Sequence, residues 1–429
     1  MTKSTNRTYP DGTPVEPLYT KGPQNNPGFR SEPWWTMVQE HLVEKEFKAN
    51  DWALERLKHG ASGLLFYLNE EHYLPRILRD IQLPYINLSL VVEGSGPAVM
   101  ESLLHHAHSE ILAIDQIKGT INIDPVEIAA RTGVWNEDKM YELGELSRLT
   151  PPQFKYMCCN ANLYGACGAS AATQLGLAAA HLDFYLDNFG SVGYSQYWLA
   201  LTSGTHMFEE MAKVRGARLL WSKLLKEYEL PEVHLEIYTE TSTTHQSIYD
   251  LHSNLLRGAS SAFGAIVGGA DHVQIRPYNS AVQWADPEGE RLALNQHFML
   301  AYESHLDHVS DPAAGAYFIE TKTQELVDQA WEYLQAIRSQ GGIIAALRKG
   351  VIQDRIAADV AQGQPEQVLG TNLYPSVNDQ WPEDFVVKEP RTREQHQKVH
   401  ADKEIEPLMP IRWAAKAEFE RASQTVKNA

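Results

Sequence analysis

The chain has 429 residues, 43% of them hydrophobic and 21% charged, and these proportions exclude a wholly disordered protein. Its 37 basic and 55 acidic residues give a formal net charge of −18, which opposes binding to nucleic acid or to an anionic membrane surface. The sequence opens without the apolar segment of a secretory signal, and no apolar run reaches the ~20 residues of a membrane span. We therefore expect a cytoplasmic protein whose partners include neither nucleic acid nor a membrane.

Residues 1–36 have the composition of an extended arm rather than of a domain. Six prolines and three glycines in this segment oppose regular helix. The arm also carries large apolar side chains, which favour docking on a surface: Leu18, Tyr19, Phe29, Trp34 and Trp35. Composition leaves open whether that surface belongs to the same chain or to a partner.

Apolar runs and amphipathic stretches alternate along the rest of the chain. Strand-like runs lie at 63–68, 86–92, 117–123, 154–159, 234–238, 272–275 and 315–319. Helix-like stretches lie at 35–58, 96–111, 125–131, 168–186, 205–228, 250–267, 291–306 and 323–339. About eight such units without a Gly-x-Gly-x-x-Gly turn favour a closed (β/α)8 TIM barrel over an open dinucleotide-binding sheet.

We expect the barrel to span residues 37–371, between the arm 1–36 and a C-terminal linker and helix at 372–429. Proline and charge are frequent from 374 to 410, which is typical of a linker, and 411–426 is amphipathic. The predicted strands and their ends carry Leu64, Phe66, Leu68, Tyr156, Ile237 and Arg276. Strand alternation should turn about half of these side chains inward, which predicts an occluded barrel axis.

The three cysteines, Cys158, Cys159 and Cys167, lie within ten residues of one another. Their odd number and low density are typical of a reducing compartment. The four-ligand spacing of a structural zinc site is missing. Packed thiols are therefore favoured over a metal or redox role.

Motifs of catalysis and of metal binding are scarce. The sequence has no Gly-x-Ser-x-Gly elbow, no Walker loop and no His-Glu-x-x-His. The densest histidine cluster, His105, His106 and His108, falls on a predicted helix, where successive side chains diverge by about 100°. A solvated helix face is therefore favoured over a metal site, and we expect no metal ligands in this chain.

Two arginines, Arg215 and Arg218, lie on the predicted helix 205–228. They could hold phosphate. The favoured interpretation is structural ion pairing with Glu209, Glu210 or a neighbouring helix, because buried arginines are usually paired.

Several longer segments carry a family likeness. They are Tyr9–Thr20, Glu209–Trp221, Gly268–Gly269 and Asp311–Glu320, the last followed by Leu326–Trp331 and Gly341–Gly342. The first resembles the arm that opens methylmalonyl-CoA mutases. The second resembles the Lys-x-Arg-x-Ala-Arg-x-Leu-Trp helix of that family, and Asp311–Glu320 resembles its Asp-Pro-x-Ala-Gly-x-Tyr strand. In order and spacing, the chain is similar to the family from Tyr9 to about Thr371.

This resemblance implies a barrel that binds acyl-CoA and a C-terminal flavodoxin-like domain that binds adenosylcobalamin. The cofactor starts a radical rearrangement of succinyl-CoA and methylmalonyl-CoA, while the protein positions and shields it. In many bacteria the enzyme pairs a catalytic chain with a smaller, similar chain that lacks activity. The nearest string to the family's cobalt-ligating Asp-x-His-x-x-Gly is Asp250–Leu255, where Leu replaces Gly, so a chance match is favoured.

Four positions differ from the active residues of the family's catalytic chains. Glu40 stands where those chains carry a Tyr, and Gln274 stands for the His of their Leu-His-Thr-Asn. Asn162 and Leu163 stand for a Tyr and for the His that bonds the thioester carbonyl. Because leucine donates no hydrogen bond, electrostatic help at that carbonyl is lost.

The resemblance therefore predicts the small, non-catalytic (beta) subunit of a heterodimeric methylmalonyl-CoA mutase, in a short form without the cobalamin-binding domain. We expect no catalytic or cofactor-binding residues in this chain. Adenosylcobalamin is expected in the partner, the catalytic large subunit, with a role of the pair in propionate metabolism. Two alternatives stay open: a substrate-binding chain of a split acyl-CoA mutase, and a lone barrel that binds acyl-CoA without turnover.

Overall fold

The computed structural model describes residues 7–8, 14–15, 30, 32–282, 286–363, 367–376 and 403–428, with side chains as far as residue 422 and none for 7–8 and 14–15. Most of the expected arm, including Tyr9, Leu18, Tyr19 and Phe29, lies outside the described residues, so both surfaces, that of its own chain and that of a partner, stay open. The short antiparallel pair β1 (Arg7–Thr8) and β2 (Pro14–Val15) belongs to this segment.

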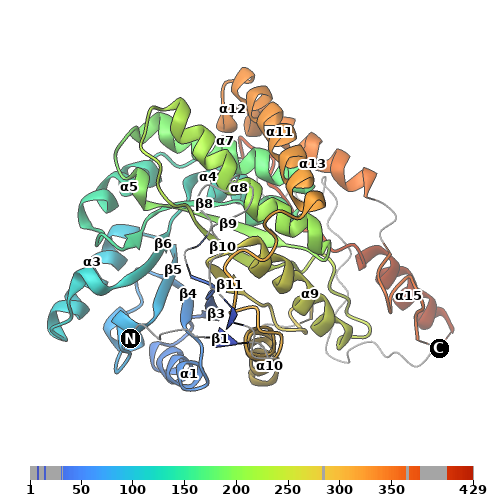
Figure 1. The fold of residues 1–429 in the computed structure, drawn as a ribbon, viewed down its shortest axis with the longest axis horizontal. Coiled ribbons are helices and arrows are strands. Elements are labelled where there is room, and N and C mark those ends of the chain that lie inside the picture. Colours follow the sequence, from blue (N-terminus) through green and yellow to red (C-terminus); the bar gives the residue numbers. More distant parts are fainter. Residues whose placement is uncertain are drawn as a thin grey trace.

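The main sheet is parallel throughout and closes on itself (Figure 1). Its strands are β3 (Thr36–Leu42), β4 (Gly63–Asn69), β5 (Asn87–Glu93), β6 (Lys118–Asn122), β7 (Phe154–Lys155), β8 (Met157–Asn160), β9 (Tyr197–Ser203), β10 (Glu236–Thr241) and β11 (His272–Gln274). They are ordered β7-β6-β5-β4-β3-β11-β10-β9-β8, and Tyr156 alone separates β7 from β8 along the chain. The nine segments therefore form an eight-stranded barrel, which confirms the predicted (β/α)8 fold.

Helices surround this barrel and extend beyond it (Figure 1). They are α1 (Glu46–Lys58), α2 (Leu74–Ile77), α3 (Gly96–Ser109), α4 (Pro125–Thr132), α5 (Asp138–Leu149), α6 (Asn162–Ala166), α7 (Ala171–Phe189), α8 (Met207–Glu227), α9 (Ser253–Gly268), α10 (Pro287–Phe298), α11 (Tyr317–Ser339), α12 (Ile343–Arg348), α13 (Val351–Gln362) and α15 (Ala415–Asn428). A π-helical turn, η4 (Met299–Glu303), follows α10, and short 3-10 turns are η1 (Leu83–Tyr85), η2 (Ile114–Gln116) and η3 (Tyr194–Gln196).

Three local predictions were wrong. The stretch 35–58, predicted as one helix, contains strand β3 before helix α1. Strand β9, all of whose residues are buried, was not predicted. The run 315–319 begins helix α11 instead of a strand. There Tyr317 and Phe318 are exposed, while Ile319, Thr323 and Leu326 are buried at helical spacing.

Strand alternation separates two apolar clusters. Leu64, Phe66 and Leu68 of β4 belong to the large core beneath the helices. A second cluster joins side chains from five different strands, and it therefore lies inside the barrel: Val38, Leu65, Cys158, Trp198, Ala200 and Tyr238. The axis is thus packed with apolar side chains, as in other TIM barrels.

The residues expected to occlude the axis were therefore mostly the wrong ones. Tyr156 and Ile237, like the three β4 residues, belong to the outer core. They face the helices because each lies one position away from an inward-facing neighbour. Of the residues expected to occlude the axis, only Arg276 points inward, where it forms ion pairs with Glu40 and Glu240.

Helix α8, which carries the segment that resembles the family, is held against neighbouring segments by ion pairs of its arginines. Arg215 pairs with Asp311 and Glu320 at 2.6 and 2.7 Å, and Arg218 pairs with Asp271 at 2.7 Å. Structural ion pairing is confirmed, although the partners are not Glu209 and Glu210. The pairs tie α8 to the start of α11 and to the turn before β11.

Candidate functional site at the two ends of the barrel

The carboxyl end of the barrel is occupied by a charged network around Arg276, which follows β11. Its Nη1 donates to Glu40 Oε1 at 2.8 Å and its Nη2 donates to Glu240 Oε2 at 2.9 Å. Tyr67 donates its hydroxyl proton to Glu40 Oε2 at 3.1 Å. Strand alternation accounts for this convergence, since Glu40, Tyr67 and Glu240 are inward positions near the carboxyl ends of β3, β4 and β10.

The network is held in its charged form. Burial alone would lower the pKa of Arg276, but Glu240 and Glu40 outweigh it and raise that pKa well above its ordinary value. Burial and the Glu40 carboxylate raise the pKa of Tyr67. Each carboxylate therefore has a permanent cation beside it, and the network stays closed at neutral pH.

Two of the four positions predicted from the family lie at this end. Glu40 and Gln274 line a space of about 10 Å³, which is about the room of one water molecule. Gln274 also accepts a hydrogen bond from Tyr238. A space this small leaves no room for an acyl group.

The other two positions lie on α6. Leu163 is buried and belongs to the large hydrophobic core, and Asn162 is half-buried beside it. The structure therefore brings Glu40 and Gln274 together but places Asn162 and Leu163 on a separate element. Leu163 makes apolar contacts, as its side chain requires.

A C-terminal strap, defined here as residues 403–422, crosses segments that follow β6, β8 and β10. Its backbone amides donate to Gly133 O, Ala130 O, Ala166 O and Thr244 O from Ile405, Leu408, Ile411 and Trp413, at 2.7 to 3.0 Å. Glu418, which is only 1% exposed, accepts from the Ile248 amide at 2.8 Å and from Arg412 at 2.6 Å. The strap thus covers part of the face where TIM-barrel enzymes hold their active sites.

One cavity of about 200 Å³ remains beneath the strap. Trp413 lines it together with His245, and the buried ion pair of Glu210 and Lys213 lies in its wall. Lys213 also donates to Thr202 O at 2.8 Å. The charges of this wall are therefore already matched within the chain.

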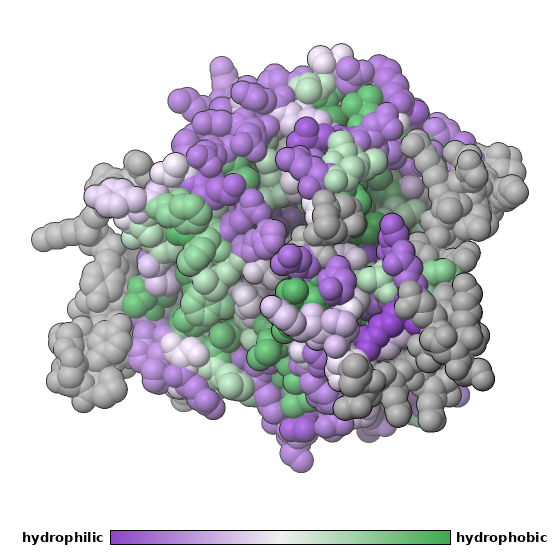
Figure 2. Space-filling model, turned by 90° about the vertical axis from the view of Figure 1, so that its right-hand side faces the viewer, coloured by the Kyte–Doolittle hydropathy of each residue, from purple (hydrophilic) through white to green (hydrophobic). Residues whose placement is uncertain are grey.

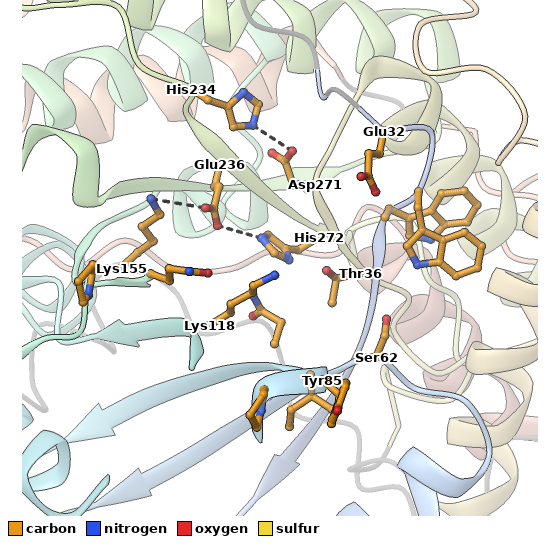
Figure 3. A pocket seen from close by; sticks show the side chains of 17 residues that line it. Glu32, Thr36, Ser62, Tyr85, Lys118, Lys155, His234, Glu236, Asp271 and His272 are labelled. Carbon is orange, nitrogen blue, oxygen red and sulfur yellow. Dashed lines mark hydrogen bonds and ion pairs between the residues drawn. The ribbon is translucent and has the colours of Figure 1, made fainter. Parts of the chain in front are cut away.

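The amino end of the barrel is open by contrast, with a cavity of about 620 Å³. Figure 3 shows Lys118 and Lys155 on one side of it and Glu236, His272 and Asp271 above them. Glu236 lies 3.5 Å from Lys155 Nζ and 3.2 Å from His272 Nε2. A cavity of this volume is large enough for a small molecule.

The charges of this cavity are mutually compensating. Burial opposes ionisation of both groups, but the hydrogen bond with Glu236 raises the pKa of His272, and the same bond lowers the pKa of Glu236. His234 donates to Asp271 at 3.1 Å. Sequence reasoning missed this site because its residues come from six strands and the turns before them, where no motif marks them.

A sequence model of the family described as Methylmalonyl-CoA mutase matches residues 68–407. The chain belongs to the methylmalonyl-CoA mutase family. Two curated relatives are named methylmalonyl-CoA mutase small subunit: that of Porphyromonas gingivalis is 30% identical over 369 residues, covering 80% of this chain and 59% of the relative. That of Streptomyces virginiae is 28% identical over 403 residues, covering 86% and 65%.

A relative named methylmalonyl-CoA mutase, from Rhizobium meliloti, is 25% identical over 332 residues, which cover 71% of the present chain and 46% of the relative. The chain thus matches less than two thirds of the length of these curated methylmalonyl-CoA mutase proteins. Among its described helices, none combines the length and apolar character needed to cross a membrane.

Proposed function

We propose that this chain is the non-catalytic partner subunit of a heterodimeric, adenosylcobalamin-dependent methylmalonyl-CoA mutase of the cytoplasm. The large subunit would bind the cofactor and carry out the isomerisation of succinyl-CoA and methylmalonyl-CoA. This chain would bind no cobalamin and would stabilise its partner. The relatives named small subunit support this assignment.

The observation that carries the proposal is the Arg276 network at the carboxyl end of the barrel. An acyl group that reacts there needs an open, water-excluded space. Here a guanidinium bonded to Glu40 and Glu240 fills that position. Opening it would separate the buried Glu40 from its cation, and breaking a buried pair costs about 3–5 kcal/mol, which favours the closed network.

Exposed apolar surface supports a protein partner. Figure 2 shows apolar side chains gathered on the side of the molecule that lies at the right of Figure 1. Large hydrophobic side chains that are more than half exposed include Leu256 of α9, Met299 and Tyr302 of η4 and Phe318 of α11. Extended apolar areas of this kind are typical of protein interfaces.

Co-expression tests the proposal directly. The chain is produced with a cobalamin-binding mutase chain from the same genome, and only the latter carries an affinity tag. We expect the two to co-purify in a fixed ratio and the mutase chain to lose stability when produced alone. Recovery of the untagged chain only in the flow-through, with a fully stable and active mutase chain, would contradict the proposal.

One observation favours the alternative of a lone barrel that binds acyl-CoA. The open cavity at the amino end holds two lysines, Lys118 and Lys155, which suit an anionic group. Trp198, Tyr238 and Leu65 fill the axis behind it, so a pantetheine arm has no path onward. Calorimetric titration of the isolated chain with CoA separates the two: micromolar binding would favour the alternative, and no heat of binding would favour the subunit.

A further inference from the structure

Two histidines and an aspartate converge in the turn between η4 and α11, outside the cavities described above. Each of His305, Asp307 and His308 offers one ligand atom, and these atoms all lie within 4.8 Å of one another. The His305 and His308 rings are stacked with their centroids 4.5 Å apart, and His308 Nε2 lies 3.7 Å from Asp307 Oδ1. In the part of the chain that the structure describes, no other three histidine, cysteine or carboxylate groups meet in this way.

The backbone holds the three side chains close without help from a ligand. The π-helical turn ends as the Ser304 amide donates to Met299 O, and the Leu306 amide donates to Leu300 O at 3.0 Å. His305 adopts a left-handed backbone conformation with φ of 56°, and the His308 amide closes the turn on His305 O at 3.2 Å. Leu306 packs into an apolar cluster between α8, α9 and α11, which anchors the turn on the protein.

We propose that His305, Asp307 and His308 bind a divalent transition-metal ion of the zinc type. Two imidazole nitrogens and one carboxylate oxygen form a donor set that zinc prefers, whereas magnesium and calcium prefer oxygen ligands alone. Three protein ligands leave a fourth position for water. Asp307 is buried and His308 half-buried, while His305 is exposed, so the ion can enter from solvent beside His305.

The geometry needs only a small adjustment. Zinc–nitrogen bonds of about 2.1 Å at tetrahedral angles place ligand atoms about 3.4 Å apart. Rotation of the exposed His305 side chain can close the remaining gap, and the backbone of the turn can stay as it is. This proposal concerns a site separate from the barrel and is independent of the proposed function.

The histidines that are densest in the sequence provide a matched control. His108 of α3 is also exposed, but its Nδ1 bonds the Leu104 carbonyl at 2.8 Å, and its neighbour His106 is buried on another side of the helix. His108→Ala therefore removes an exposed histidine without touching the turn. Asp307→Asn keeps the shape of the site but removes its charge.

The test uses the full-length chain without a histidine tag, stripped with a chelator and titrated with Co²⁺ and then Zn²⁺. We expect one equivalent of Co²⁺ to give the visible absorption of a four- or five-coordinate site, and Zn²⁺ to displace it. His308→Ala and Asp307→Asn should each weaken binding at least tenfold, since loss of even an outer-shell partner of a metal ligand costs about 10–100-fold, and His108→Ala should leave it unchanged.

Zinc should also raise the melting temperature of the wild type but not that of His308→Ala, because a ligand that binds only the folded state stabilises it. Absence of a one-equivalent cobalt spectrum would overturn the proposal. Equal loss in His108→Ala and His308→Ala would overturn it as well, because it would assign binding to solvated histidines in general.

Discussion

The two ends of the barrel differ in the arrangement of their charged side chains. At the carboxyl end, Arg276 is fully engaged by Glu40 and Glu240, and the C-terminal strap covers neighbouring loops. At the amino end, lysines, histidines and carboxylates surround an open cavity of about 620 Å³. Since TIM barrels carry out chemistry at the carboxyl end, the Arg276 network lies at the end that active sites use, and the cavity that remains beneath the strap has only about 200 Å³.

The difference supports the proposed role of the barrel as a scaffold. The axis between the two ends is filled by Trp198, Tyr238 and Leu65, so the open end does not lead to the closed one.

The largest effect is expected from Arg276→Met. Removing the guanidinium leaves the buried Glu40 beside the half-buried Glu240 without a cation, and loss of one partner of a buried pair costs about 3–5 kcal/mol. Urea unfolding measures the change. Arg348→Met is the control, because Arg348 and Glu404 are 44% and 43% exposed and such pairs contribute about 0–1 kcal/mol. A loss in Arg276→Met no larger than in the control would refute the closed network.

The strap should contribute next. Glu418→Gln removes the charge that binds Arg412 and the Ile248 amide, and hydrogen bonds to charged groups contribute about 1.5–3 kcal/mol. Thermal unfolding should show this loss, whereas Glu420→Gln, at an exposed position two residues on, should change little. If both variants melt alike, Glu418 does not hold the strap on the barrel.

How far the sequence could predict these features differs by element. Short apolar runs bounded by turn residues predicted most of the strands of the barrel, because parallel strands covered by helices are buried on both faces. Strand β9 is buried at every residue in the same way, but its run Tyr197–Ser203 was not recognised. The run 315–319 was misread as a strand because Tyr317 and Phe318 are apolar, although both are exposed at the start of helix α11.

The candidate site was harder to predict than the fold. The family resemblance marked Glu40 and Gln274, which the structure does place at the carboxyl end. It could not indicate that Arg276 would pair with Glu40, since the two lie 236 residues apart. No sequence motif marked the amino-end cavity, because its residues are scattered along the chain and have in common only their level along the barrel axis.

A smaller, pH-dependent effect is expected at the amino end. The pKa of His272 is raised by its bond with Glu236, and that of Glu236 is lowered, while Lys155 and Asp271 also face the pair. The histidine contributes stability below its unfolded pKa and loses it as pH rises through the folded pKa. The carboxylate contributes above its unfolded pKa and loses it as pH falls through the folded pKa.

Stability of the wild type relative to His272→Gln should therefore be greatest near about pH 5.5 and should shrink toward about pH 8. Urea unfolding at both pH values measures it. Arg276→Met should lose the same stability at both, because arginine stays charged throughout. A His272→Gln difference that grows with pH would show that burial, and not Glu236, determines the protonation of His272.

The central proposal is that this chain alone neither binds adenosylcobalamin nor catalyses the isomerisation, and one measurement tests it most directly. The purified chain alone is mixed with adenosylcobalamin and succinyl-CoA, and both the cobalamin absorbance and the formation of methylmalonyl-CoA are followed, with a complete mutase as positive control. The account predicts no absorbance shift and no product. Product formation by the chain alone would contradict it.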